Sequence, residues 1–278
     1  MKPTFIGIGA QKCASTWVYD ILADHPEAYV SEKKELDFFS NYYDFGFEWY
    51  ERNFIDTNKK IIGEISPSYF HGVSVPTRIK QYNPEVKLIV LLRNPEQRAI
   101  SNHQHEVRTG HIQGEDLSFE YGMKNNPSYI EQGLYATHLE NWLVHFPKEQ
   151  LLVLLFDDVI KDPVAVSKRV YQFLEIDPNH QSAALTQRSN ESYVNRSAGA
   201  EAIKNGVRSI IRKIGLGSLW NTTGKLGFQK IYRNLNRTSS NTVIPPMKEA
   251  TKQQLKESFE NEIKRLEKLI DRPLKHWL

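Results

Sequence analysis

Short apolar runs alternate along this chain with stretches that have helical periodicity. Four apolar runs predict central strands of a parallel sheet: Thr4–Gly9, Ile61–Ile65, Val86–Leu92 and Leu151–Phe156. Helical patterns lie between and after these runs: Ser15–Ala23, Ser74–Tyr82, Pro95–Arg108, Tyr129–Phe146, Pro163–Leu174 and Met247–Ile270. The alternation predicts an α/β fold, in which helices flank a central parallel sheet.

Length and composition limit how this fold is organised. The chain has 278 residues, of which 40% are hydrophobic and 25% charged, enough for a single domain over 1–278. A segment rich in Asn, Ser and Gly, 181–246, is interpreted as an irregular excursion from that domain. Within it, 201–237 is strongly basic. This basic stretch is a candidate lid over a cofactor, a surface for an anionic acceptor, a peripheral contact with an acidic membrane, or simply an exposed helix pair.

Charge, cysteine content and hydropathy exclude several classes of protein. A net charge of +3 lacks the basic excess of a general nucleic-acid binder, so any anion site must be local. The single cysteine, Cys13, excludes an internal disulfide framework, and no spacing of cysteines or histidines indicates a metal site. No apolar run approaches the ~20 residues that span a bilayer. Because the first strand begins close to Met1, we expect no secretory leader and a cytoplasmic location.

The loop between the first predicted strand and its helix is the first candidate site. Residues 9–16 read Gly-Ala-Gln-Lys-Cys-Ala-Ser-Thr. The N–H groups at the start of a helix bind anions, and Lys12 adds a positive charge beside two hydroxyls. The spacing differs from the Gly-Lys-Ser/Thr of nucleoside triphosphate loops and from the glycine triplet of dinucleotide loops. The loop therefore suits a phosphate, although a tight turn with a surface lysine has the same pattern.

A second candidate anion site follows the predicted strand 86–92. Arg93 leaves the carboxyl end of this strand, and Ser101 comes about two turns into the next helix. Ligands of such folds bind at this edge of the sheet, where both side chains can hold one anionic group. Taken alone, Arg93 has the pattern of an ordinary surface ion-pair partner, and Ser101 that of an ordinary helix residue. Two anion sites without acidic magnesium ligands indicate a nucleotide with phosphates at both ends of its ribose.

These segments resemble the sulfotransferases that use 3′-phosphoadenosine 5′-phosphosulfate (PAPS). The loop 11–17 is similar to the 5′-phosphosulfate loop of that family, except that Ala14 replaces a common glycine, and 93–101 is similar to its 3′-phosphate motif. The resemblance implies that PAPS binds at Gln11, Lys12, Cys13, Ala14, Ser15, Thr16, Trp17, Arg93 and Ser101. Where the family places a loop over the 3′-phosphate, Arg196 in Asn195-Arg196-Ser197 is the candidate here.

Further segments resemble the branch that contains heparan sulfate sulfotransferases and their bacterial relatives. Lys34–Phe39 looks like a segment whose glutamate acts as catalytic base, a role that the resemblance gives to Glu35. Gln104-His105 matches a pair whose histidine lies at the active site, so His105 is the second candidate for the base. Glu64–Phe70 is similar to a Glu-Lys-Ser/Thr stretch, but Ile65 replaces the lysine that holds the sulfonate or acceptor.

The resemblance implies in-line transfer of a sulfuryl group from PAPS, without a metal, to a hydroxyl or amine of a carbohydrate or small metabolite. Glu35 or His105 would take the proton of the acceptor, and Lys12 would stabilise the leaving phosphate. Two other functions stay open. A P-loop-like phosphotransferase is disfavoured by the missing Gly-Lys-Ser/Thr, and a nucleotide-binding protein without turnover is consistent with Ile65. The sequence specifies neither the acceptor nor the oligomeric state.

Overall fold

A computed structural model describes residues 1–54, 58–114, 116–186, 193–195, 237–239 and 244–278. The chain forms two compact units, the first from 1–99, 127–190 and 250–278 and the second from 100–126 and 191–249. Most of the predicted excursion, 181–246, and of the basic stretch, 201–237, lies outside the described residues. The role of that stretch and the organisation as a single domain therefore stay predictions.

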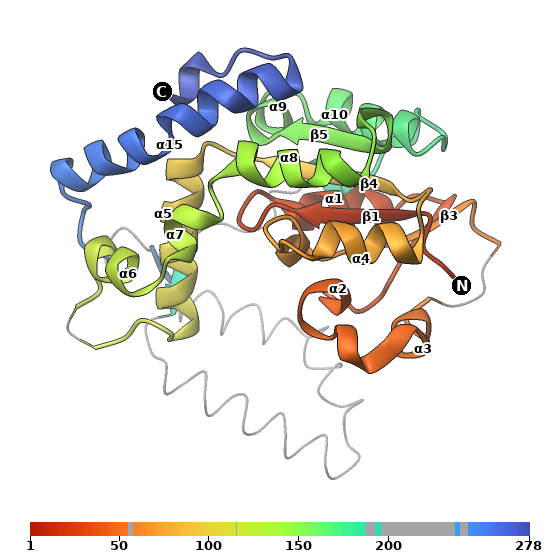
Figure 1. Ribbon diagram of the computed structural model, residues 1–278, viewed down its shortest axis with the longest axis horizontal. Coiled ribbons are helices and arrows are strands. Elements are labelled where there is room, and N and C mark those ends of the chain that lie inside the picture. The colour runs from red at the N-terminus through yellow and green to blue at the C-terminus, as the bar shows by residue number, and fades with distance from the viewer. Residues whose placement is uncertain (55–57, 115, 187–192, 196–236, 240–243) are drawn as a thin grey trace, which may run out of the picture. The chain divides into compact units, whose positions relative to one another are not determined.

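A five-stranded sheet forms the centre of the first unit (Figure 1). Its strands are β1 (Phe5–Gly9), β2 (Ala28–Val30), β3 (Ile61–Ile65), β4 (Lys87–Leu92) and β5 (Leu151–Leu155). They lie in the order β2-β3-β1-β4-β5, and every neighbouring pair is parallel. The predicted α/β fold with a parallel sheet is confirmed, and β1 is its middle strand.

The edges of this sheet differ from the sequence-based prediction. The run 151–156 was predicted as a central strand, but among the described strands β5 is an edge strand with Leu152 and Val153 only partly buried. The opposite edge strand, β2, was not predicted at all. Its three residues, Ala-Tyr-Val, are too few for a periodic pattern to show.

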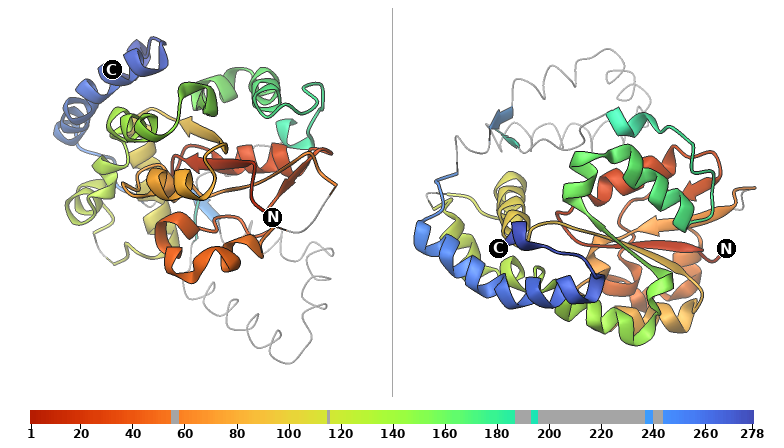
Figure 2. Two further views of the ribbon diagram at one scale, coloured as in Figure 1. Left: turned by 45° about the vertical axis from the view of Figure 1, so that its right-hand side comes forward. Right: turned by 90° about the horizontal axis from the view of Figure 1, so that it is seen from above.

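Helices cover both faces of the sheet in the first unit. Their bounds are α1 (Ser15–Ala23), α2 (Phe38–Asn41), α3 (Gly46–Glu51), α4 (Val75–Tyr82), α7 (Ser128–Glu131), α8 (Tyr135–His145), α9 (Phe156–Lys161), α10 (Pro163–Phe173) and α15 (Glu249–Ile270). Helices α1 and α10 lie on one face, and α4 and α8 on the other (Figures 1 and 2). Among the described helices, none has the length and apolar character needed to cross a membrane.

The core fixes the strands by packing both helix layers against them. On the face of α1 and α10, Ile21, Val170 and Leu174 join strand residues in one apolar cluster. Each fully buried aliphatic side chain of this kind stabilises the fold by about 1.5–3 kcal/mol. This packing supports the strands whose carboxyl ends carry the predicted site residues.

The helix predicted over 129–146 is interrupted. The chain leaves the helical conformation between α7 and α8, and Gly133 lies in this break. A Cβ atom on Gly133 would lie 2.6 Å from Cε1 of Phe259 in α15, so only glycine lets the two segments approach this closely. The sequence does not show the break, because both helices bury apolar side chains, Tyr129 in α7 and residues such as Leu139 and Trp142 in α8.

The second unit is built around the remaining helices. Helix α5 (Pro95–Thr109) begins in the first unit and continues into the second, which also contains α6 (Phe119–Asn125) and the antiparallel strands β6 (Tyr193–Asn195) and β7 (Arg237–Ser239). Val107 and Ile112 form a small apolar cluster there with Leu117 and Ile244.

Candidate functional site

The loop after β1 places Lys12 at the carboxyl end of the middle strand. Gly9 ends β1 with a φ of 152°, and a Cβ atom there would lie 2.7 Å from Cβ of Phe70. Lys12 and Ala14 follow in the left-handed region, with φ of 64° and 67°. Ala14 is the N-cap of α1, and no side chain caps the helix. The loop thus delivers a partly buried lysine directly before a helix N-terminus whose first N–H groups lack intrahelical partners.

Arg93 lies beside this loop because β4 is the hydrogen-bonded neighbour of β1. Gly9 pairs with Val90, and the N–H of Ala10 donates to the carbonyl of Leu91 at 2.9 Å. The guanidinium of Arg93 lies 4.9 Å from the ring centre of Phe156. Its Nε donates to a side-chain oxygen of the following helix, Gln97 Oε1, at 3.3 Å. Burial lowers the pKa of Arg93, while the charges of Cys13, Tyr135 and Asp157 oppose this.

A fully buried arginine, Arg98, was not identified from the sequence. Arg98 is 0% exposed, and its guanidinium donates to Gln132 Oε1 at 3.1 Å and to the carbonyls of Ser128 and Tyr129 at 3.0 and 2.6 Å. Within the described part of the chain its Nε has no hydrogen-bond partner, and no carboxylate neutralises it. Inside an amphipathic helix pattern such an arginine looks like a surface residue. A buried, uncompensated cation makes this region favourable for an anion.

The only cysteine connects the loop to α8. Cys13 is fully buried, and its Sγ lies 3.5 Å from the hydroxyl of Tyr135, the first residue of α8. Burial raises the pKa of the Cys13 thiol, while the hydrogen bond from Tyr135 and the charges of Arg98 and Arg93 oppose this rise. A thiol with a raised pKa is a poor nucleophile. Cys13 therefore supports the loop by packing, and no covalent chemistry is assigned to it.

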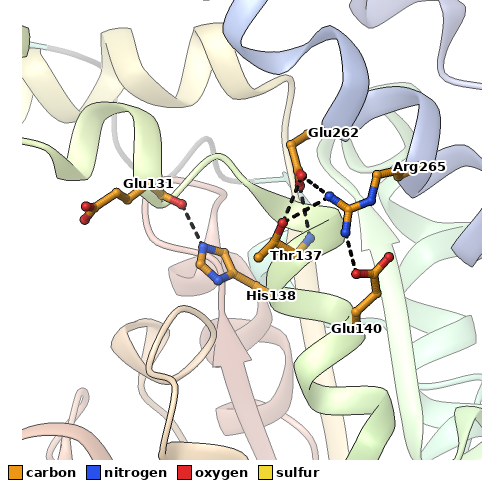
Figure 3. A network of polar contacts seen from close by, with 6 residues as sticks. All are labelled: Glu131, Thr137, His138, Glu140, Glu262 and Arg265. Atoms are coloured by element: carbon orange, nitrogen blue, oxygen red, sulfur yellow. Dashed lines mark hydrogen bonds and ion pairs between the residues drawn. The ribbon is translucent and has the colours of Figure 1, made fainter.

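The long helix α15 fixes the start of α8 through a carboxylate (Figure 3). Glu262 accepts hydrogen bonds from the N–H and the hydroxyl of Thr137, at 3.0 and 2.9 Å, in the first turn of α8. Arg265 pairs with Glu262 and with Glu140 of α8. A carboxylate at a helix N-terminus satisfies N–H groups that the helix leaves open. Helix α15 thereby helps to hold Tyr135 against the loop that carries Lys12.

Glu35 lies between β2 and α2, where it contacts the carboxyl end of β3, the strand on the other side of β1. Its N–H donates to the carbonyl of Ile65 at 3.2 Å, and its carboxylate accepts a hydrogen bond from Lys34 at 2.7 Å. The side chain is 52% exposed, so an acceptor can reach it. Since β3, β1 and β4 are neighbours, Glu35, Lys12 and Arg93 lie at three adjacent strand ends. The structure thus brings these three predicted residues to the carboxyl-terminal side of the sheet.

The other predicted residues divide into three groups. Trp17 belongs to the apolar cluster of the core, and Gln11, Ser15 and Thr16 lie in or next to the loop. Ser101 and His105 lie in the second unit, where Arg108 donates to Nδ1 of His105 at 2.7 Å. Arg196 lies outside the described residues. Contacts of all these residues with a donor stay predictions. Within the described residues, no cluster of His, Cys, Asp and Glu has the arrangement of a metal site.

A fully buried carboxylate lies next to the segment of Glu35. Glu64 in β3 is 1% exposed, and its Oε1 accepts hydrogen bonds from the hydroxyls of Tyr50 and Tyr69 at 3.0 and 2.7 Å. Its Oε2 accepts one from Ser66 at 2.6 Å. Burial raises the pKa of Glu64 to about 7, while the hydrogen bonds from Ser66, Tyr69 and Tyr50 lower it and the charge of Asp37 raises it further. The sequence placed Glu64 in a motif but assigned it no role.

This titration predicts a pH-dependent stability. Between the ordinary pKa of 4.5 and the raised value of about 7, folded Glu64 keeps a proton that the unfolded chain has released. Its contribution to the free energy of unfolding is therefore fully present below pH 4.5 and is lost as the pH rises through 7, by on the order of 3 kcal/mol. The facing tyrosines, Tyr50 and Tyr69, have pKa values raised well above 10 and stay neutral throughout.

Urea unfolding at pH 4.5 to 8 measures this loss. In Glu64→Gln the titrating group is absent, so the difference in unfolding free energy between the variant and the wild type should change steadily between pH 4.5 and 7 and level off above about pH 7. Two profiles that run parallel over the whole range would show that Glu64 does not titrate there.

Comparison with known proteins bears on what this edge of the sheet does. The profile of the sulfotransferase domain matches residues 2–220. The bifunctional heparan sulfate N-deacetylase/N-sulfotransferase 3 of Homo sapiens is 31% identical over 214 residues, which are 69% of this chain and 24% of that protein. The heparan sulfate glucosamine 3-O-sulfotransferase 3B1 of Homo sapiens is 35% identical over 179 residues, 62% of this chain and 46% of that protein. The chain therefore spans less than half the length of these relatives.

A solved structure extends the comparison to the whole chain. The crystal structure of a sulfotransferase from Alicyclobacillus acidocaldarius has a TM-score of 0.72 at 22% sequence identity, and the match covers 100% of this chain and 99% of that one. At this identity the likeness concerns the fold. The predicted arrangement of a parallel sheet flanked by helices thus has a solved counterpart.

Proposed function

The chain belongs to the sulfotransferase family, and on this premise we propose that it transfers a sulfuryl group from PAPS to a hydroxyl or amine of an acceptor. One observation carries the proposal: Lys12, Arg93 and Glu35 lie at the ends of three neighbouring parallel strands. Lys12 and Arg93 provide an anion site on the carboxyl-terminal side of the sheet, and the accessible carboxylate of Glu35 provides a base.

The residues of this edge fit an anionic donor. Arg93 and Arg98 bring positive charge, and the buried Nε of Arg98 has no partner among the described residues. The loop 10–14 adds Lys12 and the N–H groups at the start of α1. We assign the 5′-phosphosulfate to this loop and the 3′-phosphate to Arg93, with Ser101 and Arg196 as further candidates. PAPS, when bound, supplies the sulfuryl group and a bisphosphate leaving group.

The proposed chemistry assigns one role to each side chain. Glu35 takes the proton from the acceptor oxygen or nitrogen as the new bond to sulfur forms. The bond between sulfur and the bridging oxygen breaks at the same time, and Lys12 stabilises the negative charge that develops on this oxygen. The products are the sulfated acceptor and adenosine 3′,5′-bisphosphate. His105 is the alternative base.

The relatives favour a carbohydrate acceptor. Those with the names quoted above act on heparan sulfate or its glucosamine, so we propose a carbohydrate hydroxyl or amine as the acceptor group, with a small metabolite as the alternative. Location in the cytoplasm stays a prediction.

A nucleotide-binding protein without turnover is the second candidate function. At the position where the resembling enzymes carry a lysine, Ile65 is 2% exposed and belongs to the apolar core cluster. The position therefore offers no charge to a sulfonate. Catalysis, if it occurs, depends all the more on Lys12.

Thermal unfolding separates these functions. We expect adenosine 3′,5′-bisphosphate to stabilise the protein by about 2.7 kcal/mol at one hundred times its Kd. ATP with magnesium should have no comparable effect, and Arg93→Ala should remove most of the stabilisation by bisphosphate. Stabilisation by ATP with magnesium alone would indicate a phosphotransferase. Binding of bisphosphate without sulfate transfer to a broad acceptor panel would indicate a binding protein.

A further inference from the structure

Two buried hydroxyl groups connect Glu64 to the backbone that follows Glu35. The hydroxyl of Ser66 donates to Glu64 Oε2 and accepts the N–H of Asp37 at 2.9 Å. The hydroxyl of Tyr69 donates to Glu64 Oε1 and accepts the N–H of Phe39 at 3.3 Å. A single carboxylate therefore lies at the origin of two hydrogen-bond chains, and both end on the segment 37–39.

This segment needs such support because its backbone is strained. Glu35 and Asp37 have φ of 64° and 52°, in the left-handed region that costs residues other than glycine on the order of 1–3 kcal/mol each. The side chain of Asp37, the N-cap of α2, makes no capping hydrogen bond. The N–H groups of Asp37 and Phe39 are instead satisfied from the stretch 64–69. The conformation of Glu35 is thus maintained from a neighbouring element.

Above about pH 7, where Glu64 is ionised, its carboxylate suits this task because it only accepts hydrogen bonds. Each hydroxyl has one proton, and once that proton is donated to Glu64, only its lone pairs face the backbone N–H groups. The direction of both chains is therefore fixed. An amide at position 64 has two N–H donors, which would compete with the N–H of Asp37 or Phe39 for a hydroxyl oxygen.

We propose that Glu64 is a positioning residue for Glu35, which it holds in place through Ser66 and Tyr69. The inference rests on the proposed role of Glu35 as the base. In this role the buried carboxylate of Glu64 orients Glu35 toward the acceptor, although Glu64 itself touches no reacting atom. The expected consequence is a loss of turnover, with unchanged donor binding, when either chain is cut.

Two tyrosines provide a matched pair of variants. Tyr50 and Tyr69 are both 0% exposed, and both donate to the same oxygen of Glu64, but only Tyr69 continues to the backbone of Phe39. Tyr69→Phe therefore cuts one chain, and Tyr50→Phe removes an equivalent hydrogen bond without cutting it. Ser66→Ala cuts the other chain and keeps the proposal testable if Tyr69→Phe does not fold.

Amide hydrogen exchange tests the chains independently of any activity. We expect faster exchange at Phe39 in Tyr69→Phe and at Asp37 in Ser66→Ala, with both amides unchanged in Tyr50→Phe. If neither Tyr69→Phe nor Ser66→Ala accelerates exchange at its own amide, the proposed chains do not hold the segment.

Kinetics tests what the chains do for catalysis. We expect kcat to fall roughly ten- to hundredfold in Tyr69→Phe and Ser66→Ala, at unchanged KM for PAPS, because small misplacements of a reacting group have effects of this size. In a Glu35→Gln background the same substitutions should lower kcat no further. Equal losses in Tyr50→Phe and Tyr69→Phe, or additive losses with Glu35→Gln, would overturn the positioning role. A wild type that binds bisphosphate but transfers no sulfuryl group would contradict the proposed function. The amide-exchange rates of Asp37 and Phe39 test the hydrogen-bond chains independently of that result.

Discussion

Glu35→Gln is expected to lower kcat for sulfuryl transfer by roughly 10²–10⁴-fold, the usual contribution of a general base. Glutamine keeps the size of the side chain and its hydrogen-bonding capacity but takes no proton. Since Glu35 lies beside the end of β3 and the donor is assigned to the ends of β1 and β4, affinity for adenosine 3′,5′-bisphosphate should stay nearly unchanged. Radiolabelled PAPS with an acceptor panel measures the first quantity, and calorimetric titration with the bisphosphate the second.

A neighbouring carboxylate provides the control for this substitution. Glu32 is exposed and belongs to the charged run Glu-Lys-Lys-Glu that ends at Glu35, so Glu32→Gln changes the net charge equally and should leave kcat at the wild-type value. His105→Ala tests the alternative base. Full turnover in Glu35→Gln together with its loss in His105→Ala would transfer the role of base to the histidine.

Lys12→Ala is expected to lower kcat by roughly 10²–10³-fold, as does the removal of one group that stabilises charge in a transition state. The same change should weaken binding of the bisphosphate, because Lys12 belongs to the loop assigned to the 5′-phosphate. Arg93→Ala should mainly affect binding and raise the Kd for the bisphosphate. It should lower kcat at saturating donor only modestly, because Arg93 is assigned to the 3′-phosphate, which does not react.

Parallel titration and turnover measurements on both variants check this difference. Lys168→Ala is the matched control, because Lys168 is an exposed lysine of α10. If Lys12→Ala loses affinity but keeps the wild-type kcat at saturating donor, Lys12 serves binding alone. If Lys12→Ala matches Lys168→Ala in both quantities, the loop after β1 is an ordinary strand-to-helix turn.

Local sequence patterns determined much of the fold and part of the site. The apolar run before Lys12 and the helical pattern after it define a strand-loop-helix unit without tertiary information, and the run before Arg93 defines a second strand in the same way. Each pattern depends on residues close together in the chain. The charged run 32–35 is by itself typical of a solvated surface, so the role of Glu35 came from the resemblance.

Tertiary structure decided what lies next to what. Only the strand order β3-β1-β4 brings Glu35, Lys12 and Arg93 to adjacent strand ends, and pairing between distant strands has no local signature. The break at Gly133 depends on how closely Phe259 approaches, which helical periodicity does not encode.

The buried charged groups show the same division between sequence and structure. In the sequence Glu64 and Arg98 are a glutamate and an arginine, residues that are ordinarily exposed. The carbonyls around Arg98 come from residues about 30 positions away, whereas the hydroxyls around Glu64 come from Ser66 and Tyr69 nearby and from Tyr50 in another helix. The sequence by itself determined which elements form and which charges they carry. The packing of those elements decided which charged side chains are buried and which groups they hydrogen-bond, because desolvation and hydrogen bonding depend on neighbours in space.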